Sequence, residues 1–277
     1  MVVSAPGTGL GTVTGHMPIA EINGQGIHYE DSGGSGPAII LSHGFLMDAR
    51  MFEPQVEALS PEFRVIRWDA RAFGRTRWDG LPFTFWDSAA DCIGLLDHLR
   101  IDKAVVGGTC QGGYCALRVA LRYPQRVKAL VLMSTRGTSD DEDERNIHLD
   151  VAKIWSAHGP IEPIVHILAA PLLGHPKHHA PWIDRWRLIT GPQYLAATRC
   201  LVEREDLTPR LQEIHCPAIV FHGTEDDGVP ATDGEVLHES LIGSVGFVPV
   251  TGAAHIVNLT HPDAIHPPLV EFLRAHG

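Results

Sequence analysis

The sequence predicts an α/β fold in which a mostly parallel sheet is flanked by helices on both faces. Two observations predict it. Short apolar runs, such as AIILSHG at 38–44 and KAVVGG at 103–108, are typical of strands buried on both faces. Helical segments of ten or more residues separate these runs, as crossovers between parallel strands require. The 277 residues, 44% of them apolar, suffice for one large domain with an insertion.

The elements follow in order along the chain. The first is a pair of short strands within 18–33, turned at Asn23-Gly24, a dipeptide that favours a hairpin. Further strands are expected at 38–44, 64–70, 103–108, 127–135, 217–223 and 246–250, and helices at 51–60, 86–100, 111–124 and 267–277. The helix at 111–124 directly follows a strand, and Pro124 ends it.

The middle of the chain breaks this alternation. No β-like run appears there, and tryptophan, proline and histidine accumulate. We expect a helical cap over the C-terminal edge of the sheet, where open α/β sheets bind ligands. The predicted organisation is a flexible leader at 1–16, an α/β core at 17–135 and 212–277, and a helical cap at 136–211.

Composition narrows the range of partners. The net charge is −11 and no run of Lys and Arg is long enough to follow phosphates, so we expect no nucleic acid. No apolar stretch reaches the roughly 20 residues of a membrane-spanning helix, so we expect no membrane partner. Five cysteines without CxxC spacing favour reduced thiols and a cytoplasmic location. The sequence leaves a homodimer open.

A histidine cluster raises the question of a metal site. The segment GHPKHHAPW brings His175, His178 and His179 close together in sequence. Pro176 and Pro181 interrupt helical spacing, and no carboxylate or cysteine joins the histidines. We therefore expect an exposed cap loop, no metal and no cofactor.

The segment GGTCQGG at 107–113 carries the main functional signal. It joins a predicted strand to a predicted helix through a tight turn, with Cys110 in the turn. This is the geometry of a nucleophile elbow, which needs small residues such as Gly108 and Gly112 where strand and helix pass closely. The start of a helix also lowers a thiol pKa. The alternative is a small buried core residue, which is what we expect of Cys115.

A nucleophile needs a base, and the base needs a group that orients it. His255 lies in the Gly/Ala-rich loop after the strand at 246–250. Asp226 and Asp227 lie in the loop after the strand at 217–223. The order nucleophile, acid, histidine is the order that accompanies this elbow. From the residues alone, both aspartates remain candidates.

Five motifs together resemble a known family. They are LSHGF, RWDARAFGRT, GTCQGG, FHGTEDDGVP and TGAAH. In this order they are similar to the α/β-hydrolase fold family, and within it to enol-lactone hydrolases, carbon–carbon hydrolases and haloperoxidase-like esterases. The resemblance spans residues 19–277 apart from the cap, which matches only in place and size.

The resemblance implies a role for each matching residue. It selects Asp226 as the acid that orients His255, with Asp227 as the second choice. It implies an oxyanion hole made by the backbone N–H groups of Phe45 and Gln111. His43, in the motif LSHGF, matches a residue that braces the loop, and we expect a structural role for it.

Two positions depart from the family pattern. Ala72 stands where glycine is common, which suggests a slightly different turn. Cys110 stands where the family usually has serine. Two origins fit it: a native cysteine, as in dienelactone hydrolases, or a replaced serine. A native cysteine would form a thioester, which favours amine and thiol acceptors, whereas a replacement would acylate poorly or stall.

The leading hypothesis is a hydrolase of an ester or lactone that works through a covalent acyl-enzyme. Cys110 would attack the carbonyl, His255 would transfer the proton and Asp226 would orient His255. The alternatives are an acyltransferase or thioesterase with the same residues, and a non-catalytic receptor on the same fold. Three tryptophans of the cap are candidates for substrate binding, although cap packing explains them equally well: Trp155, Trp182 and Trp186.

Overall fold

A single sheet of eight strands organises the described residues, 18–277, of the computed structural model; the predicted leader at 1–16 lies outside them. The strand order is β1-β2-β4-β3-β5-β6-β7-β8. The strands are β1 (Ile19–Ile22), β2 (Gln25–Asp31), β3 (Ala38–Ser42), β4 (Arg64–Trp68), β5 (Ala104–Thr109), β6 (Val127–Met133), β7 (Ala218–Gly223) and β8 (Ser244–Val250). Pairs β1–β2 and β2–β4 are antiparallel and all others are parallel, which confirms the predicted fold class.

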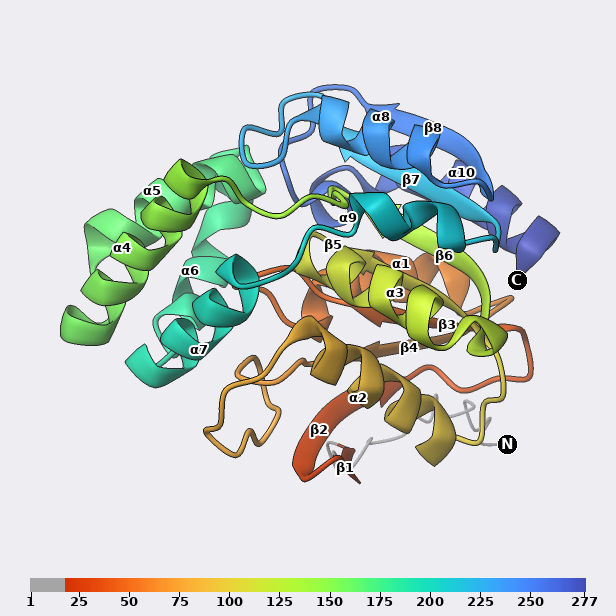
Figure 1. The fold of residues 1–277 in the computed structure, drawn as a ribbon, viewed down its shortest axis with the longest axis horizontal. Coiled ribbons are helices and arrows are strands. Elements are labelled where there is room, and N and C mark those ends of the chain that lie inside the picture. Colours follow the sequence, from red (N-terminus) through yellow and green to blue (C-terminus); the bar gives the residue numbers. More distant parts are fainter. Residues whose placement is uncertain (1–17) are drawn as a thin grey trace, which may run out of the picture.

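Helices cover both faces of this sheet (Figure 1). They are α1 (Glu53–Leu59), α2 (Phe85–His98), α3 (Gln111–Arg122), α4 (Glu142–His158), α5 (Glu162–Leu173), α6 (His179–Trp186), α7 (Gly191–Val202), α8 (Ala231–Ser240), α9 (Val257–Thr260) and α10 (Pro262–His276). Short 3-10 turns occur at Ala49–Phe52, Pro124–Arg126, Pro176–His178 and Thr208–Glu213. Helices α2, α3 and α8 lie on one face, α1 and α10 on the other, and α4 to α7 gather at one end of the molecule.

The buried strands supply side chains to two separate apolar clusters. On β3, Ile39 and Leu41 pack into the cluster that contains α1 and α10, whereas Ile40 packs into the cluster beneath α2, α3 and α8. This follows from the period of two in a strand, where successive side chains point to opposite faces. The sheet is therefore covered on both sides, as the continuous apolar runs predict.

The ends of the helices differ from the sequence prediction where local signals conflict. α10 begins at Pro262, five positions before the predicted start, and carries Pro267 and Pro268 in its interior. Because proline favours the first turn of a helix, the sequence predicts a helix start at this pair of prolines. α2 begins at Phe85 because Thr84 and Asp87 form a reciprocal capping box.

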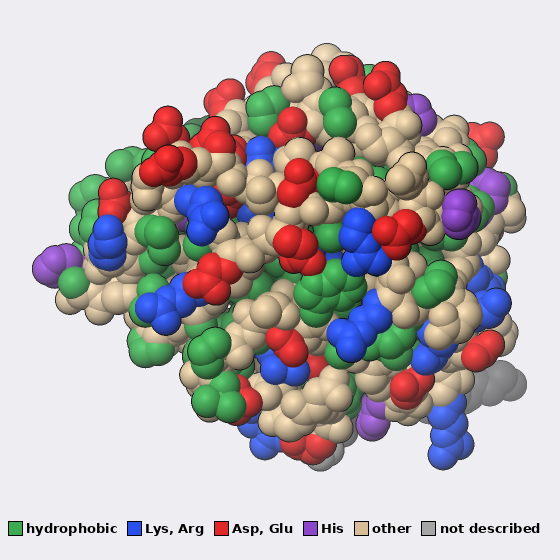
Figure 2. All heavy atoms as spheres, in the orientation of Figure 1, with side chains coloured by type: hydrophobic (Ala, Val, Ile, Leu, Met, Phe, Trp, Pro, Cys, Tyr) green, Lys and Arg blue, Asp and Glu red, His purple; other side chains and the backbone are tan. Residues whose placement is uncertain are grey.

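Surface charge is mixed on the face that Figure 2 shows. Lys and Arg side chains stand among Asp and Glu, and several of them are paired, as in Arg210–Glu213 at 2.9 Å. Among residues 18–277, no helix is long and apolar enough to cross a membrane.

Candidate active site

Loops that follow four strands meet at the C-terminal edge of the sheet. Phe45 follows β3, Cys110 follows β5, Asp226 follows β7 and His255 follows β8. Since the parallel strands end at one edge, residues far apart in the sequence come together there. All four are buried, with no more than 8% of any of them exposed.

Cys110 occupies a strained turn between β5 and α3. Its φ of 55° and ψ of −118° lie in a region that side-chain-bearing residues rarely adopt, and such a conformation costs about 1–3 kcal/mol. A Cβ on Gly108 would lie 2.2 Å from the Gly112 carbonyl carbon, and one on Gly112 would lie 1.9 Å from the Ser42 carbonyl oxygen. Only glycine fits at either position, so the close approach expected of a nucleophile elbow is present.

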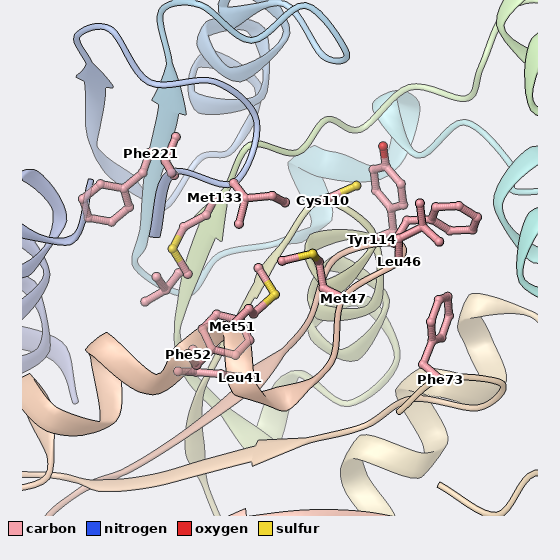
Figure 3. Close-up of a cluster of buried hydrophobic side chains, with 14 of the residues drawn as sticks. Leu41, Leu46, Met47, Met51, Phe52, Phe73, Cys110, Tyr114, Met133 and Phe221 are labelled. Atoms are coloured by element: carbon pink, nitrogen blue, oxygen red, sulfur yellow. The ribbon is translucent and has the colours of Figure 1, made fainter. Parts of the chain in front are cut away.

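Backbone and side-chain hydrogen bonds hold this turn. The Cys110 N–H donates to the Met133 carbonyl at 2.9 Å, and the Thr135 hydroxyl donates to the Cys110 carbonyl at 2.9 Å. Both partners belong to β6 or the residues just after it. Figure 3 shows Cys110 among the apolar side chains of this region, which include Met47 and Met133.

Three groups converge on the Cys110 sulfur. The His255 side chain and the backbone N–H groups of Phe45 and Gln111 each interact with the thiol in a way that favours its ionised form. Burial alone would raise the pKa of the Cys110 thiol, but the charge and hydrogen bond of His255 and these two N–H groups lower it below its ordinary value. The site therefore favours the thiolate, the nucleophilic form of cysteine.

Asp226 holds the other side of the imidazole. The Nδ1 of His255 lies 2.7 Å from Oδ2 of Asp226 and donates to it. Oδ1 of Asp226 accepts the N–H groups of Gly228 at 3.0 Å and Val229 at 2.9 Å. Asp227 is exposed, so of the two candidate aspartates the structure brings only Asp226 to His255.

The pKa values of the pair move apart. Burial raises the pKa of the Asp226 carboxyl, but His255, His222 and the Val229 N–H outweigh it and hold that pKa well below its usual range. Burial lowers the pKa of His255, but the charges of Asp226 and Cys110 raise it well above its usual range. The arrangement favours an imidazolium between a carboxylate and a thiolate.

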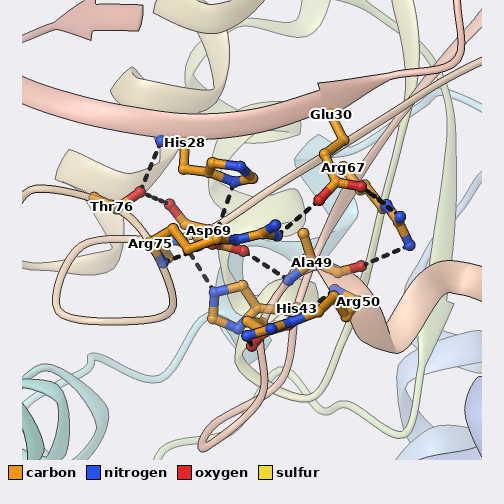
Figure 4. Close-up of polar contacts among 11 residues, drawn as sticks. His28, Glu30, His43, Ala49, Arg50, Arg67, Asp69, Arg75 and Thr76 are labelled. Carbon is orange, nitrogen blue, oxygen red and sulfur yellow. Dashed lines mark hydrogen bonds and ion pairs between the residues drawn. The ribbon is translucent and has the colours of Figure 1, made fainter. Parts of the chain in front are cut away.

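Hydrogen bonds hold the loop after β3 on two sides, through His43 on one side and through Trp186 of α6 on the other. Nδ1 of His43 donates to the Gly44 carbonyl at 2.8 Å, and Nε2 accepts the Ala70 N–H at 2.9 Å (Figure 4). Burial also lowers the pKa of His43, so its ring is neutral. Above the loop, the Trp186 indole donates to the Leu46 carbonyl at 2.7 Å. The backbone N–H of Phe45 is thus fixed from both sides.

The three tryptophans of the cap are buried. The Trp155 ring stacks on Tyr194 with centroids 4.3 Å apart, and its indole donates to the Ile189 carbonyl at 2.9 Å. Trp182 carries the guanidinium of Arg185 over its ring at 5.0 Å. Tyr194 in turn contacts the ring of Phe45 edge-on at 5.5 Å. Tyr194 thus separates Trp155 from Phe45, whereas Trp186 bonds directly to the loop that holds Phe45.

Two residues near the site escaped the sequence analysis. His222 ends β7 beside Asp226, and its only sequence signal is its position before Gly223 in the motif FHGTEDDGVP. Tyr114 lies one helical turn after Cys110, beneath the guanidinium of Arg204, whose carbon is 4.4 Å from its ring centroid. Burial raises the pKa of the Tyr114 phenol to about 12, which keeps it neutral.

The histidine cluster of the cap forms backbone contacts. The His175 ring accepts the N–H of Lys177 at 3.2 Å, and the His179 ring contacts the Gly174 carbonyl at 2.8 Å. Within the described part of the chain, no three His, Cys, Asp or Glu side chains are grouped as metal ligands.

Comparison with known proteins identifies the family. The family described as alpha/beta hydrolase fold matches residues 37–262, most of the chain. The chain therefore belongs to the α/β-hydrolase fold family, and is a hydrolase of that class.

Relatives and solved structures cover nearly the whole chain. The putative carbamate hydrolase RutD of Rhizobium rhizogenes is 30% identical over 91% of this chain and 99% of its own. The enol-lactonase of Burkholderia xenovorans has a TM-score of 0.86 at 27% identity, covering 93% of this chain and 100% of that one. A thermophilic esterase of Thermogutta terrifontis has a TM-score of 0.82 at 29% identity, covering 94% and 98%.

Proposed function

We propose that this chain hydrolyses a carboxylic ester or lactone through a covalent acyl-enzyme on Cys110. The observation that carries the proposal is the convergence on one sulfur of the His255 side chain and the N–H groups of Phe45 and Gln111. A nucleophile, a base and two oxyanion donors are the minimum that acyl transfer requires. The similarity to an enol-lactonase and an esterase supports this class of substrate.

The first half of the reaction forms a thioester. The Cys110 thiolate adds to the scissile carbonyl carbon, and the carbonyl oxygen becomes an oxyanion that accepts the N–H groups of Phe45 and Gln111. Each such donor contributes about 2.7–4 kcal/mol to the stability of the transition state. As the oxyanion collapses, the bond to the alkoxy oxygen breaks, and the His255 imidazolium gives that oxygen its proton. The alcohol, or the ring-opened end of a lactone, is released.

The second half hydrolyses the thioester. His255, now neutral, takes a proton from water, and the hydroxide adds to the acyl carbon. The oxyanion forms again in the same hole, then collapses and expels the Cys110 thiolate. Asp226 keeps the Nδ1 proton on His255, so that Nε2 faces the reacting groups in both halves.

We also propose that 136–211 is a cap that shapes the substrate site. The bond from Trp186 to the Leu46 carbonyl couples the cap to the residue beside Phe45. Trp155, Trp182 and Trp186 would form the rigid wall behind the residues that touch substrate. A cytoplasmic location stays a prediction, supported by the five unpaired cysteines.

The cysteine itself favours a second candidate reaction. A thioester is attacked by amines and thiols more readily than an ester is, so the lowered pKa of Cys110 suits acyl transfer as well as hydrolysis. With an amine acceptor the same residues act, and His255 takes the proton of the amine instead of that of water.

The test compares three proteins on a short aryl ester and a simple lactone. The chain as given is expected to turn over at least one of them, and Cys110→Ala to show only background rates. Cys110→Ser decides the origin of the cysteine: a faster serine enzyme points to a replaced serine, a slower one to a native thiol. Equal turnover by Cys110→Ala would refute the proposal, and product partition with an added amine separates hydrolysis from acyl transfer.

A further inference from the structure

A second histidine lies against the acid of the site. His222 is the last residue but one of β7, just before the loop that carries Asp226, and it is fully buried. Its Nε2 is 2.8 Å from the Val229 carbonyl oxygen and 3.3 Å from Oδ2 of Asp226. Oδ2 is the same carboxylate oxygen that accepts from Nδ1 of His255. One carboxylate oxygen therefore stands between two imidazoles.

The contacts of His222 fix which of its nitrogens carries the proton. Both neighbours of Nε2 are oxygen acceptors, so Nε2 is the protonated nitrogen and shares its proton between them. Nδ1 is buried and has no hydrogen-bond partner among the described residues. A proton at Nδ1 would have nothing to donate to, so the ring donates from Nε2 alone.

The glycine at position 234 of helix α8 leaves room for the His222 ring. Gly234 lies inside α8, where glycine costs roughly 0.5–1 kcal/mol relative to alanine. A Cβ at that position would lie 2.3 Å from Nδ1 of His222 and 3.1 Å from the ring of Phe247 on β8. Helix α8 therefore packs directly against the His222 ring and holds it in the orientation that faces Asp226.

The hydrogen bonds to Oδ1 of Asp226 come from within its own loop. The two backbone donors, Gly228 and Val229, both bind Oδ1 and belong to the same loop as Asp226. They move with that loop and do not tie it to the sheet. His222 is the donor that comes from a strand, and it binds both the Val229 carbonyl and Oδ2.

We propose that His222 is a positioning residue, which locks the loop of Asp226 to β7 and thereby aims Oδ2 at His255. It acts through Asp226 and touches no reacting atom. This inference rests on the proposed function of Asp226 and His255. The position of Asp226 also affects the nucleophile. A well-placed carboxylate stabilises the His255 imidazolium, and the imidazolium stabilises the Cys110 thiolate.

The charged side chain that the structure places against His222 is Asp226, whose Oδ2 lies 3.3 Å from Nε2 and also binds His255. β8 contributes the apolar ring of Phe247. A change at His222 is therefore expected to reach Cys110 mainly through Asp226.

The test measures the thiolate directly and needs no knowledge of the natural substrate. The rate at which iodoacetamide alkylates Cys110 is followed by peptide mass between pH 6 and 7, together with kcat and KM for p-nitrophenyl acetate. His222→Leu removes the donor, whereas His222→Gln keeps an N–H near the position of Nε2. Each is made in the unchanged chain and in Asp226→Ala. His238→Leu is the matched control, since His238 bonds to Ser244 in the same layer and not to Asp226.

In the unchanged chain, His222→Leu is expected to slow alkylation roughly tenfold, equivalent to about one unit of thiol pKa, and to lower kcat more than KM. His222→Gln should recover most of both, and His238→Leu should change neither. In Asp226→Ala, His222→Leu should have no further effect, because two residues that act through one contact are not additive.

Three results would overturn the inference: an equal loss in both backgrounds, faster alkylation in His222→Leu, or no recovery with His222→Gln. The failure of the proposed function looks different. If the chain does not hydrolyse the ester, but the alkylation rates still show that His222 acts through Asp226, the proposed ester hydrolysis is refuted and the positioning role is supported. If the ester is hydrolysed without that coupling, only the positioning role falls.

Discussion

Among residues 18–277, the buried carboxylates of Asp226 and Asp69 each lie against a buried histidine, and we propose different roles for them. In one pair, Nδ1 of His255 lies 2.7 Å from Asp226. In the other, Nδ1 of His28 lies 3.3 Å from Asp69, again with both side chains buried (Figure 4). The pKa of each carboxyl is held well below its usual range despite burial, which acts to raise it.

The surroundings of the two pairs explain the difference. Oδ1 of Asp69 accepts the Ala49 N–H at 2.7 Å, and Oδ2 accepts the Arg75 N–H at 2.8 Å and its Nε at 3.2 Å. This carboxylate ties two loops together and is neutralised by a cation. Within residues 18–277 Asp226 has no arginine partner, and the histidine that it binds also interacts with a thiol whose pKa is lowered. A buried His–Asp pair thus becomes a candidate catalytic pair when a nucleophile completes it.

Removing the two histidines should separate the roles most strongly. His255→Ala is expected to lower kcat/KM on the order of 10⁵-fold, since loss of the base disables the whole set. His28→Ala should leave activity per folded molecule near that of the unchanged chain and cost about 1–3 kcal/mol of unfolding free energy. Initial rates and urea denaturation measure the two effects. Equal rate losses in both variants would break the comparison.

The two aspartates should differ in the same sense. Asp226→Asn is expected to lower kcat on the order of 10⁴-fold, because the amide favours the wrong tautomer of His255. Asp69→Asn removes one of the two carboxylates that pair with Arg75 and should cost about 1–3 kcal/mol of stability, while Arg75 keeps its ion pair with Glu30. Thermal unfolding beside rates normalised to folded protein distinguishes them.

Acid should reveal the contribution of Asp69. A carboxyl whose pKa is lowered in the folded state stabilises it above the unfolded pKa of about 3.9 and loses that contribution as pH falls. The unfolding free energy of the unchanged chain should therefore fall more steeply below about pH 4 than that of Asp69→Asn. Parallel curves would contradict the assignment of a charged Asp69.

The reactivities of the Cys110 and Cys216 thiols give a third, smaller contrast. The pKa of Cys110 is lowered, whereas burial raises the pKa of Cys216 to about 11. At pH 6, iodoacetamide should alkylate Cys110 at least about tenfold faster than Cys216, because only the thiolate reacts. Asp226→Asn should slow the labelling of Cys110, and Asp69→Asn should not. Labelling should fall at lower pH as the Cys110 thiolate takes up a proton.

The smallest effect is expected at the neighbour of the acid. Asp227 is exposed, so Asp227→Asn should change stability by no more than about 0.5 kcal/mol and leave kcat unchanged. A large loss of kcat would mean that the loop presents the other carboxylate to His255.

How far the sequence predicts the site depends on whether a signal is local. Cys110 stands out because strand, turn and helix are contiguous, and the glycines beside it report a close approach of two backbones. His255 and the two candidates Asp226 and Asp227 follow from their places after strands, and the family resemblance selects Asp226. His222 gives no such signal, since its proposed role depends on a contact with Asp226 that only the folded chain forms.

The cap illustrates the same limit. Its helical character follows from the missing β-like runs, but the pairing of Trp186 with the Leu46 carbonyl joins residues 140 positions apart. No spacing rule encodes such a contact, and so the sequence weighs substrate binding and packing equally for the three tryptophans. In the structure the Trp155 indole donates to the Ile189 carbonyl, and the Trp186 indole donates to the Leu46 carbonyl beside Phe45.

The central claim is that Cys110 carries the acyl group during turnover. The most direct measurement is to quench the chain with acid during hydrolysis of a slow aryl ester and to map the added mass by peptide analysis. The account predicts an acyl group on the peptide that contains Cys110, removable by hydroxylamine as a thioester is, and its accumulation in His255→Ala only at a greatly reduced rate. Turnover with no acyl group on that peptide, or with the group on another residue, would contradict it.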